Sequence, residues 1–450
     1  MKLKEFDFKL PREEARKKKI MFTSISVIAL ILIITIASTF AYYQSVENQN
    51  PINTSVGEFS SGDIIFAVTI DGIPSNTFMP KTSGYVGVVT CDKGASGTWD
   101  TEQWNVVVRN LMQTKTTCNI DFVQTENLRE SVLAQFGGTT KIVVAPSGTF
   151  ENSSTETDKL MYKMEDDYGT SYYYRGAKDL LNNNLIFAGF QWKIVRINGN
   201  GTIRLIYNGD CLNNNCVINT VGPSTSIESI EFNKKDDDNK YMGYMYGGLE
   251  GVASTSRGQA TTNQTSSTVK LKLDDWYEKN IVNRGYSSKV SDTLFCNDRQ
   301  LAQEAGSTGV AMGNGFGQSG TYYASFYRLF ENKIPTLKCT QKNDRFTVSD
   351  TANGNGSLTY PVGLVSADET ILAGGTISGN AEPYIWTNHS FLTMSPSFFV
   401  TNTRLWYFAF TGFLSLNSAS VAYGLRATVN LNTNVEVIGD GSATSPFKVV

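Results

Sequence analysis

Histidine, serine and paired acidic side chains, the usual carriers of hydrolytic chemistry, are poorly placed for it in this chain. The only histidine is His389, and it stands in the polar context WTNHSF. A serine nucleophile would need this histidine as its base, yet the sequence has no G-x-S-x-G elbow and no H-E-x-x-H pair that could hold zinc. We therefore expect His389 to lie in a solvated loop, and we predict no catalytic residue, no metal site and no cofactor.

Two groups of carboxylates can be tested in the same way. The run Asp236-Asp237-Asp238 lacks the D-x-[DN]-x-[DN]-G spacing of a calcium loop, which favours a solvated turn. Asp166 and Asp167 could be the paired acids of a glycosidase, but neighbouring residues on a strand point to opposite faces and cannot flank one bond. An extracellular enzyme is therefore the less favoured interpretation.

Six cysteines form the clearest chemical pattern in the chain. An even number of cysteines outside the cytoplasm is typical of a disulfide framework, although the sequence alone admits many pairings. The short loop CLNNNC could also be half of a metal site, but no second half with histidine or cysteine lies near it. We predict three disulfides, namely Cys91–Cys118, Cys211–Cys216 and Cys296–Cys339.

The N-terminal residues predict the compartment of these cysteines. Residues 1–19 end in the basic cluster Arg16–Lys19, and residues 20–43 form an apolar stretch without charge. A helix of this length, at about 1.5 Å per residue, crosses a bilayer core of about 30 Å, and the basic flank is typical of the cytoplasmic side. We expect a single-pass protein of the cell membrane with a cytoplasmic tail, a transmembrane signal anchor and an extracellular body. The small residues of ASTFA leave cleavage and secretion open.

The charge of the body argues against a nucleic-acid partner. The chain has 39 basic and 42 acidic residues, of which 8 and 4 precede Glu47, so the body beyond holds 31 basic and 38 acidic residues. A body with this net negative charge is not attracted to nucleic acid or to anionic lipid. We expect contact with the membrane only through the one N-terminal helix.

After a polar tether over residues 44–58, residues 59–124 predict a small β-domain. Apolar or alternating runs lie at 64–70, 85–90, 104–108 and 118–122. Runs of this length, separated by turn-rich pieces, favour a sandwich of immunoglobulin-like size. Residues 125–159 then predict a connector helix and a polar linker, the linker being PSGTFENSSTETD at 146–158.

Residues 160–450 predict a larger α+β domain, and the whole chain is predicted to be mainly β. Two apolar runs, 191–197 and 202–207, flank the turn NGNG and predict a hairpin. A later strand at 425–431, from which Arg426 can emerge on the opposite face, could pair with this hairpin. The domain would then close on its own ends.

One helix and one loop region complete the prediction for this domain. Residues 269–281 place apolar side chains near one helical face, with Thr268 as a cap. Residues 380–403 mix aromatic side chains with Asn, Ser and Thr, as surfaces that hold sugars or proteins do. Within this mixture, Phe398 and Phe399 are expected in the core. The candidate ligand-binding residues are Tyr384, Trp386, His389 and Trp406, of which Trp386 is expected to be the most exposed because polar residues flank it.

Two parts of the sequence resemble surface proteins of Gram-positive bacteria. The segment STFAYYQS, followed by NTSVGEFSSGDIIFAVTID, is similar to the start of the camelysin and biofilm-matrix proteins. Residues 160–450 are similar to an uncharacterised surface-protein family of gut bacteria. The shared motifs are YKMEDDYGTSYYYRG, FAGFQWKIVRINGNGTIRLIYNG, LDDWYEKNI, TLFCNDRQL, PTLKC, YPVGLVSADETILAGG, FLTMSPSFF and YGLRATVNLNTNVEVIGDGSATSPFKV.

The second resemblance implies a fold remotely related to C-type lectins and formylglycine-generating enzymes. Their motifs W-x-x-R-S-P and G-V-R-P-V-x-x-L correspond to Leu392–Pro396 and Gly424–Leu431, where Met394 and Ala427 replace an arginine and a proline. Those enzymes bind copper through a late cysteine pair, whereas no cysteine follows Cys339 here. The resemblance implies a non-catalytic binding or adhesion module for a glycan or for a host or bacterial surface protein. The camelysin-like start leaves a structural biofilm-matrix or fibre component as the alternative.

Overall fold

The structure is a computed structural model that describes residues 52–53, 64–111, 115–211, 216–308, 313–379 and 381–450. The predicted cytoplasmic tail and membrane segment, residues 1–19 and 20–43, lie outside these described residues. Within the described ranges, no helix has both the length and the apolar character needed to span a bilayer. Strands hold 35% of the residues and helices 16%, which confirms the mainly β class.

The chain divides into two compact units, residues 1–125 (unit 1) and residues 126–450 (unit 2). Unit 1 has a four-stranded sheet of order β3-β2-β7-β4, with β2 at Ile64–Ile70, β3 at Ile73–Ser75, β4 at Tyr85–Cys91 and β7 at Thr116–Gln124. Its second sheet has the order β1-β6-β5, with β1 at Ile52–Asn53, β5 at Ser96–Asp100 and β6 at Asn105–Arg109. Buried side chains from both sheets meet in one apolar core.

Strand alternation and one disulfide shape the core of unit 1. Along β7 every second residue from Thr116 to Phe122 is buried, because successive side chains on a strand point to opposite faces. The ring of Trp99 lies 5.2 Å from that of Trp104, and both tryptophans pack against the core of the unit. Cys91 lies directly opposite Cys118 on the paired strands β4 and β7, and the predicted disulfide between them is confirmed.

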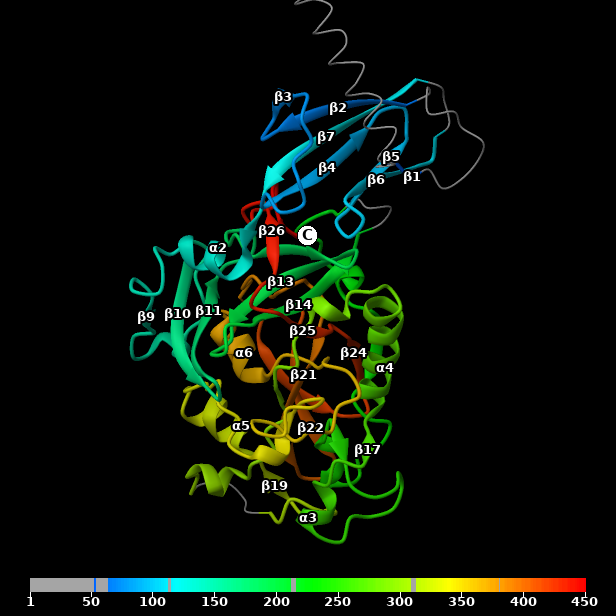
Figure 1. Ribbon diagram of the computed structural model, residues 1–450. Helices are drawn as coiled ribbons and strands as arrows, with labels where there is room; N and C mark the ends of the chain where they lie inside the picture. The colour runs from blue at the N-terminus through cyan, green and yellow to red at the C-terminus, as the bar shows by residue number, and fades with distance from the viewer. Residues whose placement is uncertain (1–51, 54–63, 112–114, 212–215, 309–312, 380) are drawn as a thin grey trace, which may run out of the picture. The chain divides into compact units, whose positions relative to one another are not determined.

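Unit 2 is built on a ten-stranded sheet (Figure 1). Its main path runs β8-β26-β27-β12-β13-β11-β10-β9, and β14 joins β13 to β25. The strands are β8 Glu126–Asn127, β9 Val143–Val144, β10 Lys159–Asp166, β11 Gly169–Gly176, β12 Asn184–Phe187, β13 Phe190–Ile197, β14 Ile203–Asp210, β25 Thr428–Leu431, β26 Glu436–Ile438 and β27 Phe447–Val449. The predicted hairpin is formed by β13 and β14, and β14 pairs with β25, so the hairpin does meet the end of the chain.

A second sheet of unit 2 has the order β15-β24-β21-β22-β23, with β19 added to β21. Its strands are β15 Ser229–Glu231, β19 Thr321–Tyr322, β21 Phe391–Phe399, β22 Thr403–Phe408, β23 Leu414–Ser418 and β24 Ala422–Gly424. Two-stranded sheets are formed by β16 (Met245–Tyr246) with β17 (Thr265–Ser266) and by β18 (Phe295–Cys296) with β20 (Arg345–Phe346). The α-helices are α2 Leu128–Ala134, α3 Arg257–Ala260, α4 Thr268–Tyr277, α5 Ala324–Phe326 and α6 Ala367–Leu372.

The helices of unit 2 cover and join its two sheets. Helix α6 contacts β11 of the larger sheet and β21, β22 and β23 of the smaller sheet, so it lies between them. Helix α4 packs against β15 along the outside (Figure 1). The predicted helix over residues 269–281 is confirmed as α4 followed by a π-helical turn at Glu278–Val282, but its cap is Ser267 rather than Thr268, because the Ser267 side chain accepts from the Lys270 amide.

Two expectations about unit 2 are wrong. The helix predicted within residues 125–159 is present as α2, with Leu128 and Val132 buried in the core of unit 2. The polar linker predicted at residues 146–158 is not free, because the amide of Ser154 donates to the Gly374 carbonyl. Arg426 does not emerge from the domain. It is fully buried and donates to the Tyr207 carbonyl, the Ile385 carbonyl and the Asn208 side chain.

Candidate functional site

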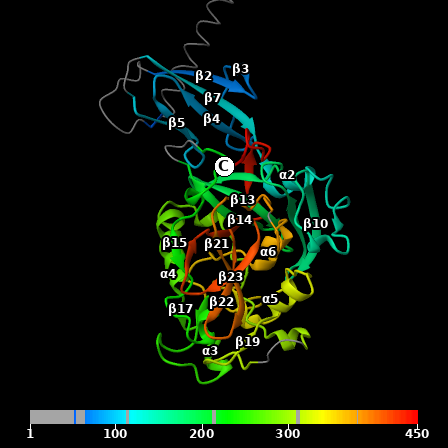
Figure 2. The ribbon, with the colours of Figure 1, turned by 180° about the vertical axis from the view of Figure 1, so that it is seen from behind.

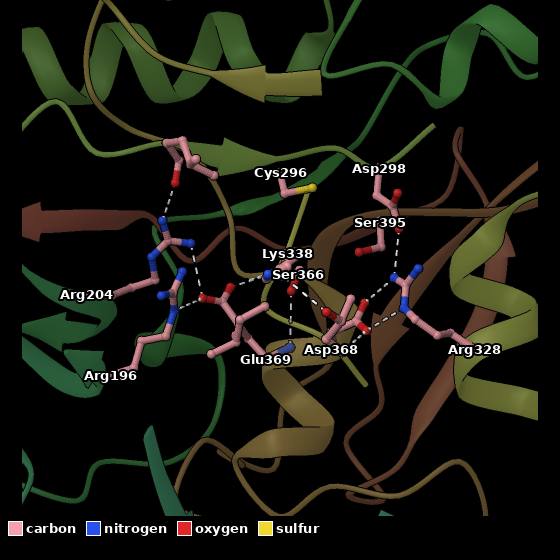
Figure 3. Close-up of a pocket in the computed structure, with 13 residues that line it drawn as sticks. Arg196, Arg204, Cys296, Asp298, Arg328, Lys338, Ser366, Asp368, Glu369 and Ser395 are labelled. Atoms are coloured by element: carbon pink, nitrogen blue, oxygen red, sulfur yellow. Dashed lines mark hydrogen bonds and ion pairs between the residues drawn. The ribbon is translucent and has the colours of Figure 1, made fainter. Parts of the chain in front are cut away.

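A group of buried charged residues joins the large sheet of unit 2 to α6 (Figure 3). This charge cluster consists of Asp166, Arg196, Arg204, Asp298, Arg328, Asp368 and Glu369. The residues come from β10, β13, β14, the segment after β18, the π-helical turn η8 (Tyr327–Glu331) and α6. Elements that are far apart in the sequence therefore meet through two groups of ion pairs, one around Glu369 and one around Arg328, which share helix α6.

Glu369 is the centre of one half of the charge cluster. The Glu369 carboxylate accepts from Arg196 Nε at 2.9 Å and from Arg204 Nη1 at 3.1 Å. Its second oxygen accepts from the backbone amide of Ser366, as part of the capping box that begins α6. Burial acts to raise the pKa of Glu369, but the guanidinium groups of Arg204 and Arg196 outweigh it, so the pKa lies below its ordinary value.

Arg328 is the centre of the other half of the charge cluster, where its guanidinium binds the carboxylates of Asp298 and Asp368. It binds Asp368 through Nε at 2.9 Å and Nη2 at 2.8 Å, and it binds Asp298 through Nη2 at 2.7 Å. Burial, with a smaller effect of the Asp368 charge, raises the pKa of Asp298 above its ordinary value, although Arg328 opposes the shift. The backbone of Asp298 has a φ of 49°, the left-handed region that non-glycine residues seldom occupy.

The Cys296–Cys339 disulfide holds the segment beside this cluster. Its Cys339 amide donates to Asp167 Oδ2 at 2.8 Å, and Asp167 pairs with Arg345 at 3.0 Å. Asp166 instead pairs with Arg196 at 2.8 Å. The two neighbouring aspartates thus have separate partners, although Asp167 lies in the turn after β10 and not on the strand as expected.

The space within the charge cluster is small. A cavity of about 20 Å³ is lined by side chains of the cluster together with Ser366 and Ser395. A cavity of this volume holds about one water molecule. With its arginines paired to carboxylates and little room between them, this cluster is suited to fixing α6 and η8 against the large sheet.

Two of the four predicted ligand-binding residues are core residues. Tyr384 is 1% exposed and Trp406 is 2% exposed, and both belong to the main core of unit 2. The Trp406 indole donates to Ser325 Oγ at 3.0 Å, so its polar atom is also satisfied inside the protein. The sequence shows the aromatic character of such residues but not which face of the sheet they occupy. Tyr384 and Trp406 therefore do not lie on a ligand-contacting surface as predicted.

The other two residues lie nearer the surface. Trp386 is half-buried, with the Lys178 ammonium 5.0 Å from its ring and its indole donating to the carbonyl of exposed Phe410. His389 is also half-buried, and within the described residues its Nε2 atom is enclosed without a hydrogen-bond partner. Burial and the nearby Arg426 charge lower the pKa of His389. His389 was expected in a solvated loop, but its side chain is only partly exposed to solvent.

The predicted turn at the acidic run is also more ordered than expected. Asp238 is buried and caps a turn of 3-10 helix at Asn239–Met242, where it accepts from the Lys240 amide. It also accepts from the backbone and the hydroxyl of Ser254. Asp238 therefore stabilises local structure rather than facing solvent.

Four aromatic rings reach the surface of unit 2, and only one of them, Phe398, was considered from the sequence. Phe399 is buried as expected, whereas the expectation that Phe398 lies in the core is wrong, because its side chain is half-buried. This aromatic patch consists of Tyr322, Phe326, Phe330 and Phe398. Phe330 stacks on Phe326 at 5.1 Å, Phe398 stacks on Tyr322 at 5.2 Å, and Tyr322 lies 4.9 Å from Phe326. Phe330 is 53% exposed and the other three are half-buried. The spacing of Phe326 and Phe330 in ASFYRLF is the one sequence feature that points to this patch.

Fold and site together define a mainly β, disulfide-bonded protein of two units, and its three disulfides fit an oxidising, extracellular environment. Comparison with protein-family models, with curated proteins and with solved structures found no match.

Proposed function

We propose that this chain is a cell-surface protein whose unit 2 is a non-catalytic binding or adhesion module, with a glycan as the partner. The observation that carries the proposal is the aromatic patch. The exposed ring of Phe330 stacks on the ring of Phe326, which holds it in place, and its other face is a flat apolar surface. Aromatic faces beside polar groups suit ligands that combine apolar and hydrogen-bonding surfaces, as sugars do.

The surroundings of the aromatic patch supply the polar groups. The Arg404 guanidinium lies 5.7 Å from the Phe398 ring, and Arg404 Nε donates to Asn402 Oδ1 at 3.4 Å. Val400, 54% exposed, lies in the turn after β21, two residues beyond Phe398. Phe398 and Val400 fall within residues 380–403, the region that sequence analysis favoured for recognition.

The aromatic patch lies on elements at one end of unit 2, which is consistent with a role in binding a ligand. Figures 1 and 2 show α2 and β26 at one end of unit 2, with β19 and α5 toward the other end. The chain enters unit 2 at Glu126, next to α2. Recognition is commonly carried by loops on a rigid sheet scaffold, and here the scaffold is the six-stranded sheet that contains β21.

An array experiment tests this function. The purified full-length chain is applied to glycans and, in parallel, to host and bacterial surface proteins. We expect binding to a subset of glycans that is lost in Phe330→Ala and kept in Phe410→Ala, which removes an equally exposed ring elsewhere. Binding to proteins alone would contradict the glycan assignment, and turnover of a small substrate without a binder would contradict the whole class. Loss of binding only in Trp386→Ala would move the site to Trp386.

A further inference from the structure

Lys193 on β13 is a buried amine that is held by neutral groups. It is 4% exposed, and its Nζ donates to Asn184 Oδ1 at 2.6 Å and to Asn219 Oδ1 at 2.7 Å. In the part of the chain that the structure describes, no carboxylate forms an ion pair with it. Buried lysines are ordinarily paired with a carboxylate, so this arrangement calls for an explanation.

The surroundings of Lys193 raise the fraction of its neutral, nucleophilic form. Burial, with smaller contributions from the Arg426 and Lys178 charges, lowers the pKa of Lys193 to about 8, while Asp179 opposes the shift. About a tenth of the side chain is then neutral at pH 7. A lysine that is desolvated in this way is an activated nucleophile.

The Asn184 carboxamide is fixed beside this amine. Asn184 lies directly opposite Lys193 in the β12–β13 ladder and is 3% exposed. Its Nδ2 donates to the Gly441 carbonyl at 2.9 Å, which sets the orientation of the amide group. Because a C=O bond is about 1.2 Å long, the carbonyl carbon Cγ lies within about 4 Å of Lys193 Nζ. Only a small movement separates this arrangement from the distance at which such atoms react.

We propose that Lys193 and Asn184 form an intramolecular amide bond between strands β12 and β13. Lys193 Nζ attacks Asn184 Cγ, the Nζ–Cγ bond forms and the Cγ–Nδ2 bond breaks. The electron pair of the broken bond leaves with Nδ2, which takes a proton from the attacking amine and departs as ammonia. The reaction is a transamidation that needs no oxidant, reductant or further reactant.

Asn184 is a better partner than Asn219 for two reasons. Asn219 is only half-buried, so water competes for its carbonyl group, whereas Asn184 is enclosed. Asn219 also lies in the segment after the Cys211–Cys216 disulfide rather than on a paired strand. The Asn219 oxygen instead accepts a hydrogen bond from the amine and thereby orients it toward Asn184.

Peptide mapping of the purified full-length chain tests the bond, because both residues fall in one tryptic fragment. Trypsin does not cleave after an acylated lysine, so the linked chain should yield residues 179–196 with the mass of one ammonia missing. Tandem fragmentation should give no backbone fragments between residues 184 and 193. This fragment contains no Asn-Gly pair, so succinimide formation at such pairs cannot imitate the result.

The alternatives give different peptides. An unlinked chain yields residues 179–193 at full mass, and that result alone would overturn the proposal. A link to Asn219 would join residues 179–196 to residues 205–234, and would refute the choice of Asn184. The variant Lys193→Arg keeps a positive charge but carries no amine of this kind, so it should show no loss of ammonia. Since the wild-type chain decides the question, a variant that fails to fold does not obscure the outcome.

Discussion

At the scale of single residues, the stability of unit 2 depends on buried charges that satisfy one another. Glu369 accepts from two arginines, and neither arginine is exposed. Removing one partner of a buried ion pair leaves the other charge without compensation and typically costs about 3–5 kcal/mol. Glu369→Gln should therefore lower the free energy of unfolding by about that amount, measured by denaturant unfolding of the full-length chain.

The matched control for Glu369 is Glu304, which pairs with Arg257 where both side chains are partly exposed. Exposed pairs contribute about 0–1 kcal/mol because water and salt screen them. Glu304→Gln should thus have a small effect. If the two substitutions cost the same, the charge cluster does not have the structural role assigned to it.

Asp298 gives unit 2 a predicted dependence of stability on pH. Its folded-state pKa is raised, so above the ordinary pKa of about 4 the folded chain holds this proton more tightly than the unfolded chain does. The contribution of Asp298 to stability therefore falls as the pH rises from about 4 through the folded-state pKa. Asp298→Asn removes the titrating group and should flatten the loss of stability over this window. Parallel pH curves for the variant and the wild type would contradict this prediction.

The contribution of Glu369 to the stability of unit 2 should change with pH in the opposite direction. Its folded-state pKa is lowered, so its contribution is present above the ordinary carboxyl pKa and is lost as the pH falls through the folded value. The two carboxyls can be separated because each has its own variant. Residue type alone could not predict either behaviour, because burial by tertiary packing raises the pKa of Asp298 and the distant Arg204 and Arg196 lower that of Glu369.

At the scale of elements, the two disulfides of unit 2 should contribute unequally. Cys296–Cys339 joins residues 43 apart, whereas Cys211–Cys216 joins residues 5 apart. Loop-closure entropy gives about 4 kcal/mol for the longer loop and about 2 kcal/mol for the shorter. The double variant Cys296→Ser with Cys339→Ser should therefore shift the denaturation midpoint more than Cys211→Ser with Cys216→Ser. The reverse order would show that native contacts of the short loop outweigh its chain entropy.

Local patterns were sufficient to predict several elements. The turn NGNG between two apolar runs predicted the β13–β14 hairpin, and helical spacing of apolar residues predicted α4. All three disulfides were predicted from compartment and spacing. These features are encoded by residues close together in the sequence or by a strong chemical constraint.

Elements defined by distant contacts were not predictable in the same way. The polar stretch 146–158 has the composition of a linker, yet Arg175 donates to the Thr149 and Asn152 carbonyls and holds it against unit 2. The aromatic patch arises only when α5, η8, β19 and β21 come together. For the same reason Tyr384 and Trp406 were placed on a surface, although tertiary packing buries them.

At the scale of the molecule, the two units have separate cores, and the aromatic patch belongs to unit 2. A binding function located in unit 2 should therefore be insensitive to core changes in unit 1. Val106→Ala removes buried apolar volume from unit 1 and should cost about 1–3 kcal/mol of its stability. Glycan affinity should remain unchanged, which titration of the full-length variant would test. A parallel loss of affinity would indicate that unit 1 takes part in binding.

The central claim is that unit 2 binds a ligand through the aromatic patch. Its most direct test is isothermal titration of the full-length chain with a glycan selected on the array, comparing the wild type with Phe330→Ala and Phe410→Ala. Loss of a central ring contact should weaken binding at least about tenfold, equivalent to about 1.4 kcal/mol. We predict that loss for Phe330→Ala and an unchanged dissociation constant for Phe410→Ala. Equal affinities for all three proteins would contradict the account.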